Sequence, residues 1–163
     1  MIIAFVVAVL LAIGDQLIKL LVVNTLKTGD TVSILNGLVE FFYCENEGMA
    51  FGMLQNGRWL FVTFTLAIII GLVVYTVKTK PQSKFFLASL SLIIGGGLGN
   101  LIDRIFYGYV IDYIQLSFFS PVCNFADYCI TAGTVMLVIY VLFFSSSDED
   151  KNSSNEPEKL KAE

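Results

Sequence analysis

Four aspartates lie inside or at the rims of long apolar segments of the sequence: Asp15, Asp103, Asp112 and Asp127. A carboxylate near lipid costs on the order of a few kcal/mol by insertion scales, so it usually serves a function. Three of the four fall within residues 95–127, a stretch that also holds Asn100, Arg104 and Asn124. A membrane protein that gathers carboxylates and amides in this way is expected to carry out chemistry or to move ions there.

Asp112 and Asp127 are the first candidates for chemistry. Two carboxylates brought close together cannot easily both ionise, so one can act as a base while the other donates a proton. Peptide hydrolysis needs those two roles and neither a metal nor a histidine. A proton or cation relay is the alternative use of the pair. Asp127 could also simply cap a helix, whereas Asp112, which is embedded in apolar and aromatic residues, has no such explanation.

The chain contains no histidine. This excludes catalytic triads built on histidine and the HExxH zinc proteases, and no GxSxG motif is present. The three cysteines, Cys44, Cys123 and Cys129, lack the spacing of metal ligands. We expect no metal and no cofactor. The cysteines are interpreted as packing residues, with a disulfide between Cys44 and Cys123 as the alternative.

The remaining polar residues have both structural and functional interpretations. Asp15 and Lys19 are four residues apart and share a helix face, which favours a structural pair with the lysine reaching toward the outer interface over a proton relay. Asp103 and Arg104 favour an ion-pair network at the rim of a helix over contact with a catalytic group or substrate. Asn46 is read from the residues alone as a turn residue. Four glycines favour close helix packing over an open substrate slot: Gly95, Gly96, Gly97 and Gly99.

These side chains must be positioned by membrane-spanning helices. The sequence is 56% hydrophobic and only 15% charged, against about a quarter charged in soluble domains. Four apolar segments approach the length that crosses about 30 Å of hydrocarbon. We expect spans at about 1–23, 59–77, 85–102 and 128–144. The first resembles a secretory signal only superficially, since it lacks a basic start and a small-residue cleavage site.

The expected fold is an all-α membrane protein with four transmembrane helices and a small extracytoplasmic sheet and loop region. Residues 1–144 form one domain, and the polar residues 145–163 form a disordered cytoplasmic tail. Asn36-Gly37 lies between two apolar runs and predicts a hairpin on the membrane surface. No basic patch suggests nucleic acid, and a monomer is expected.

Lysine positions predict the orientation in the membrane. The connection between the second and third spans carries Lys78, Lys80 and Lys84 without an acid, and the tail adds three more lysines. The positive-inside rule places that side and both termini in the cytoplasm. The clustered aspartates then lie near the extracytoplasmic face, which disfavours a relay because relays usually distribute acids through the depth of the membrane.

An ordered set of motifs resembles the bacterial lipoprotein signal peptidases, or signal peptidase II. The set consists of Asp15-Gln16 with Lys19, Asn46-x-Gly48-x-Ala50-Phe51-Gly52, Gly99-Asn100-x-x-Asp103-Arg104, Val110-x-Asp112 and Asn124-x-Ala126-Asp127. It covers about residues 10–135. Each motif alone is weak, but the ordered set on four spans is highly specific.

The resemblance implies an aspartic endopeptidase of the bacterial cytoplasmic membrane. Its substrates would be diacylglyceryl-modified prolipoproteins, cleaved just before the lipidated cysteine. The catalytic positions of the family match Asp112 and Asp127, a choice that spacing alone does not make. The positions that bind substrate or support the pair match Asn46, Gly48, Asn100, Arg104 and Asn124, and the supporting polar network matches Asp15, Lys19 and Asp103. Membrane lipids are the other implied partners.

The chain departs from the family pattern at two loop positions. Glu45 stands where a basic residue is common, and Met49 where alanine is common. These departures bear on how the loop contacts lipid or substrate rather than on the chemistry. A transporter that uses the four aspartates and a non-catalytic scaffold remain the alternatives to a protease.

Overall fold

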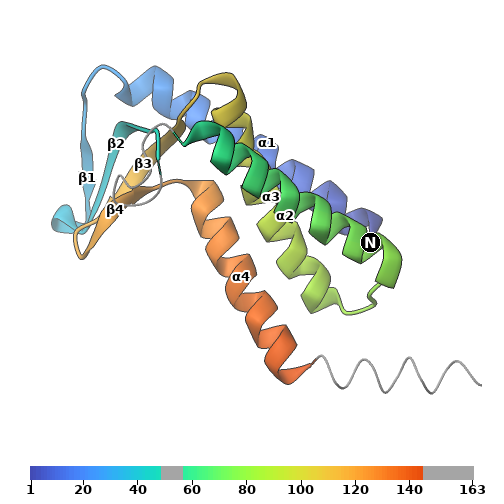
Figure 1. Cartoon of the computed structure of the whole chain (residues 1–163). Helices are drawn as coiled ribbons and strands as arrows, with labels where there is room; N and C mark the ends of the chain where they lie inside the picture. Colours follow the sequence, from blue (N-terminus) through green and yellow to red (C-terminus); the bar gives the residue numbers. More distant parts are fainter. Residues whose placement is uncertain (49–56, 145–163) are drawn as a thin grey trace, which may run out of the picture.

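Four helices and a small antiparallel sheet make up the protein, a computed structural model that describes residues 1–48 and 57–144 (Figure 1). The helices are α1 (Ile2–Leu26), α2 (Arg58–Thr79), α3 (Lys84–Phe106) and α4 (Phe125–Phe143). All four are long and apolar enough to cross a membrane, as the sequence predicted. The expected tail, residues 145–163, lies outside the described residues.

Helix α3 is the centre of the bundle and packs against α1, α2 and α4. Its small residues allow this. A Cβ atom on Gly95 would lie 2.8 Å from the Ala8 carbonyl oxygen of α1, and one on Gly96 would collide with the Ala126 carbonyl of α4. The expectation that the glycines serve close packing is therefore met at these two positions.

The sheet has the strand order β1-β2-β3-β4 and lies at the end of the bundle where α1 ends and α4 begins (Figure 1). Its strands are β1 (Val32–Ile34), β2 (Val39–Asn46), β3 (Val110–Leu116) and β4 (Phe119–Cys123). The predicted hairpin joins β1 and β2 through the short helix η1 (Leu35–Gly37). Gly37 has φ +86°, the left-handed conformation that such a tight turn needs.

The second outer connection is more ordered than the residues alone indicated. Helix α3 continues to Phe106 rather than ending near 102, and α4 begins at Phe125 rather than 128. Both extra turns are possible because the polar side chains that they contain, Asp103 and Asp127, find partners inside the protein. The sequence did not indicate β3, since both faces of Val110–Tyr113 are buried and its apolar residues do not alternate.

Candidate active site

A cavity of about 600 Å³ lies between α2, α3 and α4, beside the sheet. Most of its polar lining comes from residues that the sequence singled out: Asn46, Gly48, Asn100, Arg104, Asp112 and Asp127. Thr65 and Thr134 add hydroxyl groups to the wall. The rest of its wall is mostly apolar, with Phe61, Phe64 and Ile68 from α2 and Ile130 and Leu137 from α4 among the lining residues. A polar end is therefore continuous with an apolar groove between helices.

Asp112 projects into this cavity from β3 and is only 2% exposed. Its Oδ1 accepts a hydrogen bond from Asn124 Nδ2 at 2.6 Å, and its Oδ2 accepts one from Asn46 Nδ2 at 2.7 Å. Burial and, to a smaller extent, the negative charge of Asp127 raise the pKa of Asp112 to about 6, although the two amide donors oppose this shift. Asp112 therefore holds a proton far more readily than an ordinary aspartate.

Asp127 stands in the first turn of α4, where it forms a capping box with Asn124. Its Oδ2 accepts from the Asn124 backbone N–H at 3.0 Å, and its Oδ1 accepts from Asn100 Nδ2 at 2.8 Å. The capping role considered from the sequence is thus real, yet the same carboxylate lines the cavity with Asp112. The carboxylate therefore lies at the positive end of the α4 helix dipole.

Three amide side chains hold the two carboxylates, and each has one possible orientation. Asn124 Oδ1 accepts from the Asp127 N–H at 3.0 Å, so its Nδ2 faces Asp112. Asn100 Oδ1 accepts from Lys19 Nζ at 3.0 Å and from Asn124 Nδ2 at 3.2 Å, so its Nδ2 must point to Asp127. Asn46 Oδ1 accepts from the Gly48 N–H at 3.0 Å, so its Nδ2 faces Asp112. Because an ammonium and a backbone N–H can only donate, these contacts determine which way the amides face.

A second cluster of charges lies behind the amides, away from the cavity. Lys19 Nζ is 2.8 Å from both Asp15 Oδ2 and Asp103 Oδ2, and all three side chains are almost fully buried. The expected structural pair is present, but the expected reach of Lys19 toward the outer interface is wrong. Two carboxylates and Asn100 satisfy its three N–H donors inside the protein.

The two aspartates of this cluster connect elements that are distant in sequence. Asp15 Oδ1 accepts from the Ala126 N–H at 3.1 Å, which ties α1 to the start of α4. Asp103 Oδ2 accepts from the Ile111 N–H at 3.1 Å, which ties α3 to β3. The network therefore positions the two elements that carry the cavity carboxylates, strand β3 with Asp112 and helix α4 with Asp127.

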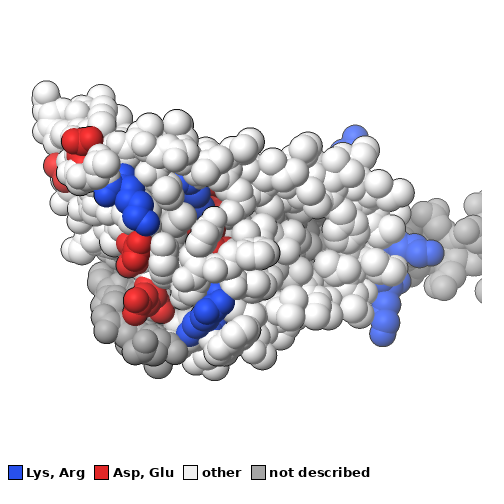
Figure 2. All heavy atoms as spheres, turned by 90° about the horizontal axis from the view of Figure 1, so that it is seen from above, with Lys and Arg blue, Asp and Glu red and all other residues white. Residues whose placement is uncertain are grey.

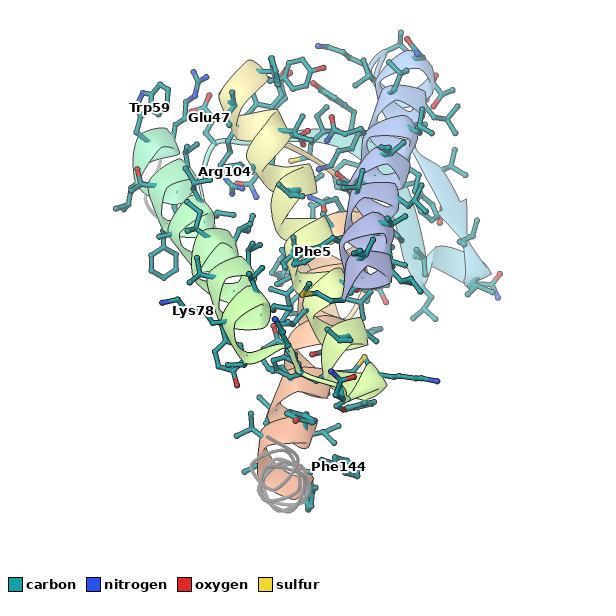
Figure 3. The ribbon with its side chains drawn as sticks, turned by 90° about the vertical axis from the view of Figure 1, so that its right-hand side faces the viewer. Phe5, Glu47, Trp59, Lys78, Arg104 and Phe144 are labelled. Carbon is teal, nitrogen blue, oxygen red and sulfur yellow. The ribbon has the colours of Figure 1, made fainter. Side chains whose placement is uncertain are left out.

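Arg104 does not join Asp103 in one network at the helix rim. Its side chain projects from α3 toward α2, where its guanidinium lies 5.2 Å from the centre of the Phe61 ring (Figure 3). It lines the cavity together with Asp112 and Asp127 and places a positive charge near them. The interpretation as an ion-pair network thus holds for Asp103, whereas Arg104 faces the cavity.

Three contributors were missed by reasoning from the residues. Gln16 Nε2 donates to Asp103 Oδ1 at 2.8 Å, and the Tyr113 hydroxyl accepts from the Phe125 N–H at 3.1 Å. Phe61 is the ring beneath Arg104. Gln16 has a sequence signal, because it is an amide inside an apolar span, whereas an aromatic residue in a membrane helix carries none.

The predictions for the cysteines and for the loop motif remain to be compared with the structure. All three cysteines are free, so no bond joins Cys44 and Cys123 in this structure. Cys123 lines the cavity, where burial and the two carboxylates raise the pKa of its thiol to about 11. The end of the loop motif, Ala50-Phe51-Gly52, and the departure at Met49 lie outside the described residues.

Comparisons with known proteins give a consistent result. A model of the family described as "Signal peptidase (SPase) II" matches residues 7–143. The "Lipoprotein signal peptidase" of Clostridioides difficile is 43% identical over 145 residues, 87% of this chain and 97% of that protein. The protein of the same name from Clostridium novyi is 40% identical over 132 residues, 78% and 89% of the two chains. A solved structure described as a bacterial membrane enzyme superposes with a TM-score of 0.80 at 31% identity, covering 88% of this chain and 90% of that one.

Four membrane-length helices, three of which enclose a cavity with a polar end, define a polytopic membrane enzyme. The two carboxylates at that end, held by amides, are groups suited to acid–base chemistry. The chain belongs to the signal peptidase II family.

Proposed function

We propose that this protein is a membrane aspartic endopeptidase that removes the signal peptide from diacylglyceryl-modified prolipoproteins, cutting just before the lipidated cysteine. The observation that carries the proposal is the pair Asp112 and Asp127, which line one cavity, share Asn124 as a partner and have unequal surroundings. Family membership supplies the substrate class.

The unequal surroundings assign the roles in hydrolysis. Asp127, at the start of α4, takes a proton from a water molecule as that water attacks the scissile carbonyl carbon. Asp112 donates its proton to the carbonyl oxygen, and a tetrahedral diol forms. The protonated Asp127 then gives its proton to the leaving amine nitrogen, the carbon–nitrogen bond breaks, and Asp112 recovers its proton from the diol hydroxyl.

Arg104 and the apolar wall serve substrate binding in this proposal. The guanidinium of Arg104 at the cavity edge can donate a hydrogen bond to a peptide carbonyl of the substrate next to the catalytic dyad, Asp112 and Asp127. Phe64, Ile68 and Leu137 give the acyl chains and the apolar signal peptide a surface without charge. Gly97 also lines the cavity, so one of the four glycines serves the open slot as well as packing.

Charge placement supports a site at the extracytoplasmic face of the bacterial cytoplasmic membrane. Figure 2 shows charged side chains near the two ends of the molecule, with an uncharged band between them. Lys78 and Lys84 flank the connection between α2 and α3 at one end, whereas Arg58 and Arg104 lie at the ends of those helices nearer the sheet. Both termini would then be cytoplasmic. The cavity carboxylates and Asp103 all lie near the sheet, which fits a monomeric protease better than a relay through the membrane.

The test is release of the signal peptide from a diacylglyceryl-modified prolipoprotein by purified protein. Asp112→Asn and Asp127→Asn should each lower the rate by on the order of 10²–10⁴-fold, since each removes an acid–base group. Asp30→Asn is the matched control, because Asp30 is an exposed acid that does not line the cavity, and its carboxylate accepts a hydrogen bond from the Thr28 hydroxyl.

Two results would contradict the proposal. Full activity in either dyad variant would exclude the pair as the catalytic groups. Inhibition of the wild-type enzyme by a chelator would contradict the metal-free mechanism. Within residues 1–48 and 57–144, no three His, Cys, Asp or Glu side chains are grouped to hold a metal ion.

A further inference from the structure

Every backbone N–H group at the start of α4 has a hydrogen-bond acceptor. The first four N–H groups of a helix have no partner within the helix. In α4 the first intrahelical bond runs from the Tyr128 N–H to the Asn124 carbonyl, so the four groups belong to residues 124–127. Asn124 and Asp127 satisfy each other through the capping box. The N–H groups of Phe125 and Ala126 depend on side chains from other elements.

Those two side chains come from α1 and from β3. Asp15 Oδ1 accepts from the Ala126 N–H, and the Tyr113 hydroxyl oxygen accepts from the Phe125 N–H, both at 3.1 Å. Asp15 also belongs to the buried charge network, since its other oxygen binds Lys19. Tyr113 lies outside that network and does not line the catalytic cavity. Its hydroxyl therefore acts on the start of α4 rather than on the cavity itself.

Tyr113 is held firmly beneath the start of α4. Its side chain is 3% exposed and packs in an apolar cluster with Val22 and Leu26 of α1. Phe125 packs against the same cluster. Because close packing leaves the ring little freedom, strand β3 determines where the hydroxyl lies and, with it, where the Phe125 N–H lies.

Strand β3 therefore acts on both cavity carboxylates. Asp112 and Tyr113 are adjacent, so their side chains project from opposite faces of the strand. Asp112 lines the cavity directly. Tyr113 holds the first turn of α4, which carries Asp127. One short segment of the chain thus controls the separation of the two carboxylates.

We propose that Tyr113 is a positioning residue for hydrolysis, whose hydroxyl holds the start of α4 so that Asp127 stays within reach of Asp112. This role rests on the proposed function, since it requires the two aspartates to act as a pair. Tyr113 takes no part in proton transfer, because burial raises the pKa of its hydroxyl and keeps it protonated. A phenylalanine at this position would keep the ring and leave the Phe125 N–H without its acceptor.

Tyr113→Phe tests this role, and Tyr43→Phe is the matched control. Tyr43 packs against the same apolar cluster and its hydroxyl donates to Glu45 at 2.6 Å, but it does not line the catalytic cavity. Each variant removes one hydrogen-bonded hydroxyl and keeps the ring. Amide hydrogen exchange, resolved by NMR in detergent, reads the contact directly. The Phe125 N–H should exchange about 3–10-fold faster in Tyr113→Phe, the range expected for one lost hydrogen bond, and at the wild-type rate in Tyr43→Phe.

Signal-peptide release gives the functional readout. In Tyr113→Phe the kcat should fall by a similar factor of about 3–10. The pH profile distinguishes a displaced Asp127 from a loss of folded protein. The negative charge of Asp127 helps to raise the pKa of Asp112, so a more distant Asp127 lets that pKa fall. Activity should then decline at a lower pH than in wild type. The nearby cations, Lys19 and Arg104, are held by contacts that do not involve Tyr113.

Three results would overturn the positioning role. They are an unchanged exchange rate of the Phe125 N–H, a fall in kcat with an unchanged pH profile, and equal effects of Tyr43→Phe. The exchange measurement requires no cleavage. Full activity in Asp112→Asn would contradict the proposed function, whereas an unchanged exchange rate contradicts only the role of Tyr113.

Discussion

At the scale of single residues, the two cavity carboxylates differ in what surrounds them rather than in how many bonds they accept. Each oxygen of Asp112 and of Asp127 accepts one N–H donor. Asp127 adds the helix start, whereas Asp112 is surrounded by buried strand residues. The difference in electrostatic environment is what separates an acid from a base in a symmetric pair of side chains.

The raised pKa of Asp112 predicts a pH-dependent stability cost. The pKa of Asp112 is about 6 in the folded protein, against 3.8 for an unperturbed aspartate. Below pH 4 the side chain is protonated in both the folded and the unfolded state and its ionisation costs no stability. As pH rises through 6 the unfolded chain ionises more readily than the folded one, so the free energy of unfolding falls. Asp112→Asn has no such ionisation. The free energy of unfolding of the variant, relative to wild type, should therefore increase between pH 4 and 7 by up to about 3 kcal/mol.

Thermal denaturation in detergent across this pH range measures the effect, with Asp30→Asn as the control for removal of an exposed acid. A variant-to-wild-type difference that does not change with pH would show that Asp112 is not ionising near pH 6.

At the scale of elements, the sheet and helices are joined through α3. Its glycines bring α1 and α4 close, and its Asp103 shares Lys19 with Asp15 of α1. Neither contact follows from local sequence, since the partners are at least 30 residues apart. The geometry of the cavity therefore depends on the register of α1 against α3.

Removal of the buried lysine should destabilise this junction. Lys19→Met leaves Asp15 and Asp103 buried without a cation, which costs about 3–5 kcal/mol when one partner of a buried pair is removed. Lys27→Met is the control, because the Lys27 side chain is 52% exposed and 3.7 Å from Glu45, and such surface pairs contribute less than about 1 kcal/mol. Denaturation midpoints of the purified variants measure both.

A second substitution distinguishes lost charge from lost packing as the cause of the destabilisation by Lys19→Met. Adding Asp103→Asn to Lys19→Met should recover part of the lost stability, since it removes one of the uncompensated charges. If the double variant were no more stable than the single one, lost packing rather than lost charge would be the cause.

Glycine substitutions test the close contact of α1 with α3. A Cβ atom at position 99 would lie 2.5 Å from Asp15 Oδ2 and 2.9 Å from its Cγ, so Gly99→Ala should cost about 1–3 kcal/mol through overpacking. Gly14→Ala is the matched control in α1, where nothing lies within 4 Å of the added carbon. It should be neutral or stabilising by up to about 1 kcal/mol. Equal effects of the two changes in denaturation assays would contradict the packing role.

At the scale of the whole molecule, the protein has one polar end that carries the site and another marked by lysines (Figure 2). This polarity predicts the orientation of the protein in the membrane. Green fluorescent protein fused after residue 163 should fluoresce, and alkaline phosphatase fused there should be inactive, because both report a cytoplasmic C-terminus. The opposite pair of results would place the C-terminus outside and would contradict the proposed location of the site.

The four helices, the hairpin and the set of polar residues that line the cavity could all be predicted from the residues alone. The thickness of the hydrocarbon layer imposes a length that can be read directly from composition, and the high cost of a carboxylate near lipid makes each one conspicuous. The orientation expected from lysines follows from the same local information. Lys19 was identified as a partner of Asp15 because the two are four residues apart on one helix.

The partners of each polar residue became visible only in the folded chain. Asp103 and Asp112 cannot be distinguished by type or neighbours, yet one bonds to Lys19 of α1 and the other to Asn46 of β2. Arg104 turns to the cavity while the adjacent Asp103 turns away from it. These differences arise because residues from distant segments of the chain determine which charge is paired and which faces the cavity. A local sequence pattern does not indicate where distant segments meet.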